Sequence, residues 1–188
     1  MQKGTNENKY RENLRQQLVE AHAKVEYTYT AHHKINNRIV CLDKVLRIAQ
    51  IILTAISTGG FLATIITNKT VLCWIGGVAA ALSLGLNLYT KDFKLFETAR
   101  KHKEAADALW EVREAYVSLL VDMDVISLEE VAQKRDKLTE RVAEINKLFP
   151  GTDRSGYKKA KKALTEEEEQ TFNEGEAEKF LPTNLRNK

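Results

Sequence analysis

The chain has 188 residues, a formal net charge of +3 and 43% hydrophobic residues, which suits one domain with a tail. Its 2 Cys exclude a disulfide framework, and its 9 Gly and 2 Pro disfavour a β-rich fold, which needs many turns. Charges of both signs are interleaved outside one apolar window, unlike the one-sided basic surface of a nucleic-acid-binding protein. We therefore expect no nucleic-acid partner.

Residues 1–46 are predicted to form a cytosolic helix that runs on into the apolar window. Apolar or small residues recur at steps of three or four, and no Gly or Pro occurs between Thr5 and Thr58. His32 lies on the same face and bridges the one longer gap in this apolar stripe. We expect a single helix whose cytosolic part, about 40 residues, is ~60 Å long.

Residues 47–90 are predicted to form a two-span transmembrane hairpin. Two apolar runs, Ile48–Thr67 and Val71–Thr90, contain no charged residue. Each has about 20 residues, enough at ~1.5 Å per residue to cross a ~30 Å hydrocarbon core. Two buried helices of a soluble bundle are the alternative, which the absence of a charged face disfavours. The three residues 68–70 that connect the runs force a tight antiparallel hairpin.

The charges that flank the window predict the topology. Residues 1–47 carry nine Lys and Arg, whereas the connection carries only Lys69, and Lys and Arg are abundant again after residue 90. The positive-inside rule then places both termini in the cytoplasm.

Small residues recur at four-residue spacing on each run, and such ridges let helices approach closely in lipid. The alternative is that Ala and Gly are simply frequent in membrane spans. The residues predicted to pack are Ala55, Gly59 and Ala63 in the first run and Gly77, Ala81 and Gly85 in the second.

Another face of each run is polar. The candidate residues are Gln50, Thr54, Ser57, Thr58 and Thr64 in the first run and Asn87 in the second, where Cys73, Gly76 and Ser83 share its face. Hydroxyl and amide groups at this depth need hydrogen-bond partners. Two interpretations stay open: hydrogen bonds between helices, or the wall of a water-filled pore in an oligomer.

Residues 91–150 are predicted to form cytosolic helices that pack on the N-terminal arm. An apolar stripe that includes His102, expected to be a buried hydrogen-bonding residue, continues without Gly or Pro to a break at 122–126. Ser127 and Glu130 then match a capping box, and Pro150 ends the helix that follows. Residues 151–188 are predicted to be a polar tail, disordered or short-helical.

The sequence contains no phosphate-binding Gly-rich loop, no nucleophile elbow and no cluster of metal ligands. An enzyme needs a constellation of such groups. We therefore expect no catalytic residue, no cofactor and no metal.

The long arm, the tight hairpin and the helix that begins KLFETARKHKEAADALWEVREAY resemble the SLATT family of bacterial two-transmembrane effectors. The resemblance covers residues 14–149 and rests most on the spacing of Ala99, His102, Ala106 and Leu109. It implies an all-α membrane protein, a hairpin continuous with a cytosolic helical bundle. It also implies an anti-phage effector that forms pores in the inner membrane as a homo-oligomer.

The resemblance further implies a trigger from a nucleotide-messenger synthase or sensor protein encoded nearby. A non-conducting scaffold that anchors a cytosolic partner is the alternative function. An ordinary ion channel is disfavoured, because residues 68–70 supply no acidic ring.

Overall fold

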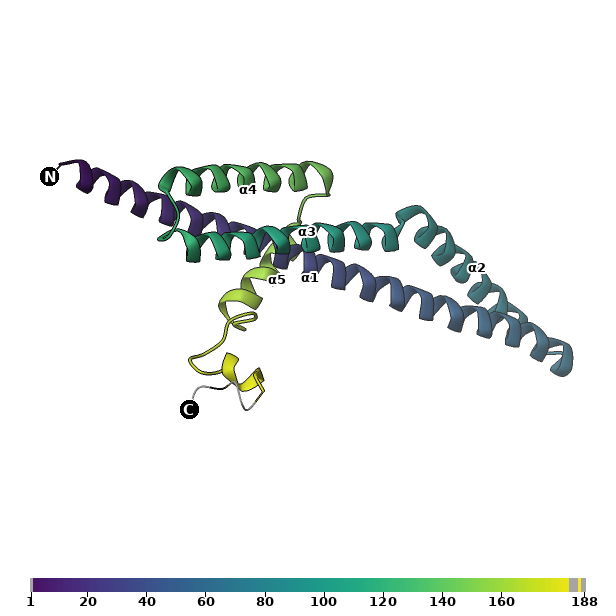
Figure 1. Ribbon diagram of the computed structural model, residues 1–188. Helices are drawn as coiled ribbons and strands as arrows, with labels where there is room; N and C mark the ends of the chain where they lie inside the picture. Colours follow the sequence, from purple (N-terminus) through teal and green to yellow (C-terminus); the bar gives the residue numbers. More distant parts are fainter. Residues whose placement is uncertain (1, 183–185, 187–188) are drawn as a thin grey trace.

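A computed structural model describes residues 2–182 and 186, and over these residues the protein is all-helical. The elements are α1 (Gln2–Thr67), α2 (Thr70–Phe93), α3 (Leu95–Asp122), α4 (Leu128–Leu148), α5 (Arg154–Thr165) and a short 3-10 helix (Ala177–Phe180). Figure 1 shows an elongated molecule in which α1 runs from end to end. The helix α2 returns along one half of α1, and α3, α4 and α5 gather around the other half.

The prediction that the N-terminal arm continues unbroken into the first apolar run is confirmed. The helix α1 has 66 residues and is helical without interruption from Gln2 to Thr67. At 1.5 Å per residue it is about 100 Å long. One helix therefore belongs both to the bundle and to the hairpin.

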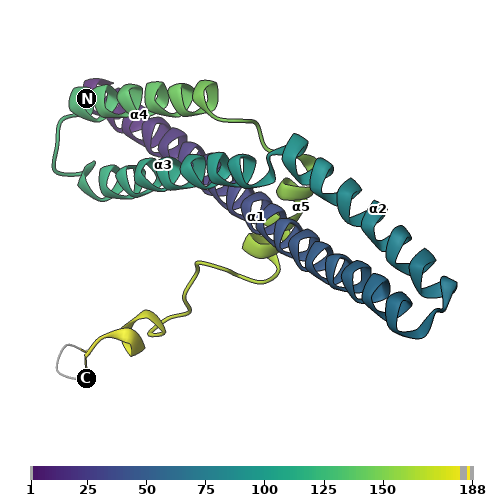
Figure 2. The same ribbon diagram turned by 90° about the vertical axis from the view of Figure 1, so that its right-hand side faces the viewer.

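The core of the bundle lies where α3 packs antiparallel on the first half of α1, with α4 packed mainly along α3 (Figure 2). The predicted stripes face one another there: Leu18 on α1 and Leu109 on α3 are both fully buried. The other buried apolar members are Leu14, Val25, Val112, Tyr116, Leu119, Met123, Val131 and Ile145. The stripe spacing of three and four residues is what brings these side chains to one face of each helix.

Between α2 and α3 the helix is interrupted, although no Gly or Pro lies between Gly85 and Pro150 to break it. The helix breaks at Lys94, whose φ of 40° is left-handed. The half-buried positions of α2 end at Thr90, whereas the stripe of α3 begins at Leu95. That five-residue step puts the two stripes on different sides of a continuous helix, and the break turns the stripe of α3 back onto α1.

The predicted break and restart after α3 are confirmed. The helix α3 ends at Asp122, and the Ser127 hydroxyl accepts a hydrogen bond from the Glu130 backbone N–H at 3.2 Å. This is one half of the capping box that the sequence predicted. The helix α4 ends at Leu148, two residues before Pro150.

In the tail the structure contains the short helix, α5, but its packing was not predicted. Gly156, Ala160 and Ala163 are buried against α1. A Cβ at Gly156 would lie 2.5 Å from Ile35 Cγ1 and 3.2 Å from the Ala31 carbonyl oxygen, so glycine permits this close crossing.

Polar contacts fix α5 at both ends. Asp153 caps the helix by accepting from the Gly156 N–H at 2.6 Å, and it also accepts a hydrogen bond from Arg38 on α1. The Arg38 guanidinium holds the pKa of Asp153 below its ordinary value. Beyond the helix, Lys34 pairs with Glu169 at 2.7 Å. These contacts tie the segment after α4 to the middle of α1.

Leu18→Ala is expected to lower the free energy of unfolding by about 2–5 kcal/mol, because it leaves a cavity in the α1–α3 core. The adjacent Val19 is 42% exposed, so Val19→Ala is expected to stay within about 0.5 kcal/mol of the parent. Denaturant unfolding of the detergent-solubilised protein measures both values. Equal losses in the two variants would contradict this assignment of the core.

Candidate membrane hairpin

The hairpin is formed by the last part of α1 and by α2, which pack antiparallel and turn at Asn68 and Lys69. Asn68 has a left-handed φ of 52°, a conformation that asparagine tolerates better than most residues. The turn lies at the far end of the molecule from α4 (Figure 1).

Gly60 on α1 and Gly76 on α2 make a close contact between the two helices. A Cβ at Gly60 would lie 2.9 Å from the Leu72 carbonyl oxygen and 3.1 Å from the Gly76 Cα. A Cβ at Gly76 would lie 3.0 Å from the Ser57 carbonyl oxygen. The two backbones therefore approach closely, and a side chain at Gly60 would force backbone atoms to shift.

A seam of buried and half-buried residues runs along the hairpin at steps of three and four on both helices. We call these residues the hairpin seam. They are Leu46, Gln50, Leu53, Ser57, Gly60 and Thr64 on α1 and Leu72, Gly76, Ala79, Ser83, Leu86 and Thr90 on α2. The spacing is that of two helices packed along their length, so the seam is filled by the hairpin's own side chains.

The outer surface of the hairpin is apolar and exposed. Among the described residues, the helical stretch Thr70–Asp122 is long and apolar enough to cross a membrane, and only 11% of its apolar window is buried. A core helix of a soluble protein would be mostly buried. On α1 the same surface continues, with Ile66 82% exposed. The other large exposed apolar residues include Ile51, Leu62, Ile65, Val71, Trp74, Leu82 and Leu84.

Three of the polar residues proposed from the sequence lie in the hairpin seam. These are Gln50, Ser57 and Thr64, which are half-buried, and the Thr64 hydroxyl donates to the Gly60 carbonyl at 2.8 Å. Their place in the seam makes them neighbours of α2 within one chain.

The other three polar residues, Thr54, Thr58 and Asn87, are exposed. Thr54 Oγ1 donates to the Gln50 carbonyl at 2.8 Å and lies 3.0 Å from Ser83 Oγ. Because its one hydrogen is directed to that carbonyl, Ser83 is the donor in the contact with Thr54. Thr54 thus forms a hydrogen bond between the helices, one of the two interpretations left open by the sequence.

At the base of the hairpin, next to the break at Lys94, a groove of about 500 Å³ lies between α1 and α2. Gln50 and Asn87 line it together, so the structure brings two of the polar candidates to one place. Charged side chains also line the groove, and among them Asp43 accepts a hydrogen bond from Arg47 at 2.7 Å.

The small residues predicted to pack do not make the close contact within the hairpin. Gly59, Gly77 and Gly85 have open space where a Cβ would be. Ala55 and Ala81 are exposed, and Ala63 is half-buried. Packing of these positions against another copy stays a prediction.

Sequence reasoning gave no role to Gly60 and placed Gly76 on the polar face but not among the packing residues, although each is the neighbour of a predicted glycine. The signal lay in the pairs 59–60 and 76–77, in which only one glycine can face the partner helix.

Beside the hairpin, in the bundle, two buried histidines join α1 to α3. His32 and His102 are 3% and 5% exposed, and their Nδ1 atoms are 2.8 Å apart. Burial, and then the neighbouring His102, lowers the pKa of His32 to about 4, and burial lowers the pKa of His102. Both rings are therefore neutral at pH 7, and one donates its Nδ1–H to the other. The expectation that His102 is a buried hydrogen-bonding residue is confirmed.

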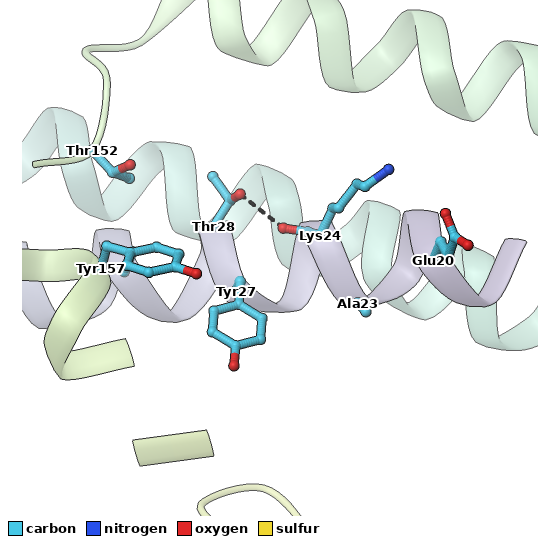
Figure 3. A pocket seen from close by; sticks show the side chains of 8 residues that line it. Glu20, Ala23, Lys24, Tyr27, Thr28, Thr152 and Tyr157 are labelled. Carbon is cyan, nitrogen blue, oxygen red and sulfur yellow. Dashed lines mark hydrogen bonds between the residues drawn. The ribbon is translucent and has the colours of Figure 1, made fainter. Parts of the chain in front are cut away.

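A second groove, of about 440 Å³, follows α1 beside α5 (Figure 3). Tyr157 of α5 stacks on Tyr27 of α1 with ring centroids 5.8 Å apart, and Glu20 and Lys24 are the charged side chains of the lining. Among the residues that the structure describes, no three His, Cys, Asp or Glu side chains form a group that could hold a metal ion. The groove shows no arrangement that we can assign to a reaction.

These features define an all-helical protein in which an apolar hairpin extends from a helical bundle. The sequence model of SMODS and SLOG-associating 2TM effector domain family 4 matches residues 14–176, and the chain belongs to this family. The resemblance to SLATT proteins is confirmed, and the match includes α5 as well as the hairpin. A comparison with curated proteins and one with solved structures found no match.

Gly60→Ala and Gly76→Ala are each expected to lower the free energy of unfolding by about 1–3 kcal/mol, because the added methyl meets backbone atoms of the other helix. Gly59→Ala and Gly77→Ala are matched controls, because both positions face open space within the single chain. Their higher helix propensity should leave the fold of a monomer in a micelle unchanged or more stable. Unfolding in detergent micelles measures all four. A loss in the controls as large as in the test variants would refute the Gly60–Gly76 contact.

The free energy of unfolding is expected to fall as the pH is lowered from about 6.5 to about 4, because the unfolded chain takes up protons on His32 and His102 first. The shift of His32 alone corresponds to about 3 kcal/mol. The variant His32→Leu/His102→Leu removes both partners and should flatten this pH dependence. A slope identical to that of the parent protein would show that other groups cause it.

Proposed function

We propose that the protein is a membrane effector of a bacterial anti-phage or conflict system, in which the hairpin crosses the inner membrane twice. The exposed apolar surface on both helices of the hairpin carries this proposal. Each Leu, Ile or Val that leaves water contributes about 1.5–3 kcal/mol, so a bilayer is the environment that this surface fits. The family name, a two-transmembrane effector domain, supports the same assignment.

The polar groups of the hairpin are compatible with lipid. Thr58 and Thr64 donate to carbonyls one turn earlier, at 3.0 and 2.8 Å. Hydroxyl groups that are bonded in this way need no water. Lys and Arg flank the hairpin on the side of the bundle, which supports a topology with both termini in the cytoplasm.

We further propose that several copies assemble into a pore when a partner protein senses a nucleotide signal. One hairpin encloses no pore, because its seam is closed by the contact between Gly60 and Gly76. A water path must therefore form between copies. The exposed Thr58 and Asn87 are candidates to line it, and the groove at Gln50 is a candidate for its entrance.

A non-conducting scaffold is the second candidate function. The hydrogen bond between Thr54 and Ser83 favours it, because this bond uses polar groups inside one hairpin and leaves fewer of them for water. A scaffold would anchor a cytosolic partner through the bundle without letting ions pass.

Induced expression, together with the proteins encoded next to this chain, is expected to depolarise bacterial cells. Leu82→Arg should abolish depolarisation, because arginine near the middle of a span costs about 2.5–3.5 kcal/mol of insertion. Leu148→Arg is the control: Leu148 is 76% exposed but lies in α4, outside the hairpin. A potential-sensitive dye reports depolarisation, and membrane fractionation reports insertion. A membrane-inserted parent chain that never depolarises would favour the scaffold.

A further inference from the structure

The helix α5 presents an unusually basic surface. It carries five Lys and Arg and no Asp or Glu. Lys162 is paired with Glu167 at 2.8 Å. In the part of the chain that the structure describes, no carboxylate pairs with Arg154, Lys158, Lys159 or Lys161. We call these four residues the α5 basic face, and all of them are exposed.

A surface of opposite charge lies on α3. Asp107, Glu111 and Glu114 follow one another at steps of four and three and are exposed or half-buried beside Trp110, which is 47% exposed. We call these four residues the α3 acidic face. Within the described residues, Glu111 pairs with no Lys or Arg.

Positive charge within the chain cancels part of this surface, because Lys103 pairs with Asp107 at 2.6 Å. Glu111 is therefore the carboxylate that is left for a partner. Arg113 is held by Glu26 on α1 as well as by Glu114. Burial lowers the pKa of His22 and of His33, so neither adds a charge at neutral pH.

The α3 acidic face is hollowed in a way that suits a cationic side chain. A hollow of about 390 Å³ is lined by Tyr29, His33, Asp107, Trp110 and Glu111. Carboxylates bind an ammonium or guanidinium group directly, and the aromatic rings add cation–π attraction and cover its aliphatic stem. The chemistry of the hollow therefore matches a lysine or arginine.

The two faces lie at one height on different sides of α1. Tyr27 and Lys34 contact the segment that holds α5, whereas Tyr29 and His33 line the hollow. Both sets fall within the same two turns, and they are about 140° apart around the helix. Copies anchored in one membrane share one orientation and one depth, so each α5 basic face is level with the hollow of a neighbour.

We propose that the α5 basic face of one copy binds the α3 acidic face of the next copy, so that the chains associate head to tail around the membrane normal. The proposal rests on the membrane insertion of the proposed function. A two-fold dimer through either face would set like charges against each other, whereas a head-to-tail contact pairs opposite charges and can close into a ring.

A second copy fits this surface better than lipid. Arg38, which contacts the start of α5, is nine residues before Arg47, so α5 lies about 14 Å from the base of the hairpin. Over that separation, screening with a Debye length of ~10 Å at 0.1 M salt weakens the attraction to headgroups. An anionic partner of any kind would also leave the acidic hollow unexplained.

Charge reversal tests the contact. Lys158→Glu and Glu111→Lys are each expected to weaken self-association in detergent by at least about tenfold, because each opposes like charges. The two changes combined in one chain restore the opposite signs and should recover most of the association. Leu148→Arg changes an exposed site in α4 and should leave it unchanged. Mass photometry measures the oligomers, and circular dichroism verifies that each variant is folded.

Disulfide cross-linking gives a second, independent readout. In a chain with Cys41→Ser and Cys73→Ser, the pair Lys158→Cys/Glu111→Cys should produce a ladder of oxidised oligomers in membranes. Each single cysteine should not extend beyond a dimer. A monomer-only pattern, or reversal variants that associate as the parent does, overturns the interface.

The two proposals fail separately. Cross-linked oligomers that never depolarise cells would reject the pore and retain the interface. Depolarisation by both reversal variants at the parent level, with unchanged association, would reject the interface and retain the pore. Loss of binding to anionic vesicles in Lys158→Glu, without loss of association, would assign the basic face to lipid and overturn the contact.

Discussion

The helix α1 packs against each of the other four α-helices that the structure describes. It forms the hairpin with α2 and the core with α3. It also contacts α4, and α5 covers part of its surface. A helix of this length is not stable in water by propensity alone, since helical stability in proteins comes mainly from packing of an apolar face. Its neighbours therefore stabilise α1, and α1 in turn fixes where each of them lies relative to the hairpin.

This shared helix gives the bundle a mechanical link to the hairpin. A rigid helix transmits a tilt or rotation, provided that the element has two arrangements between which it moves. On the side of the bundle, α1 is held by the His32–His102 hydrogen bond and by the ion pair of Arg38 with Asp153. A partner that changes either contact acts on the same helix that enters the hairpin.

The sequence predicted the elements that depend on local pattern and missed those that depend on which side of a helix meets a neighbour. The continuous α1, the cap at Ser127 and the buried His102 followed from spacing and residue type. The sequence placed the polar residues of the first run on one face, but the structure divides them. Gln50 and Thr64 lie within the hairpin seam because α2 covers part of that face, whereas Thr54 and Thr58 are exposed. The sequence pattern of one helix does not determine which of its faces the partner helix covers.

The break at Lys94 and the docking of α5 show two further limits. The five-residue step between Thr90 and Leu95 was visible in the sequence, and it is the signal that a straight helix cannot keep both stripes on α1. The helix α5 has few apolar residues, so composition indicated a solvated segment. Its packing depends instead on small residues, above all Gly156 against Ile35, which composition does not distinguish from a flexible linker.

Because α1 is one uninterrupted helix, it also restricts how related chains can differ in length. One residue added between Arg38 and Arg47 would turn the hairpin by about 100° relative to the bundle, because each residue advances a helix by that angle. Gly60 would then no longer face α2 while His32 faces α3, although α2 and α3 follow one another directly along the chain. Insertions of seven residues come close to preserving both. We therefore expect insertions or deletions in this segment to comprise whole pairs of helical turns, which keep the bundle and the hairpin on the same sides of α1.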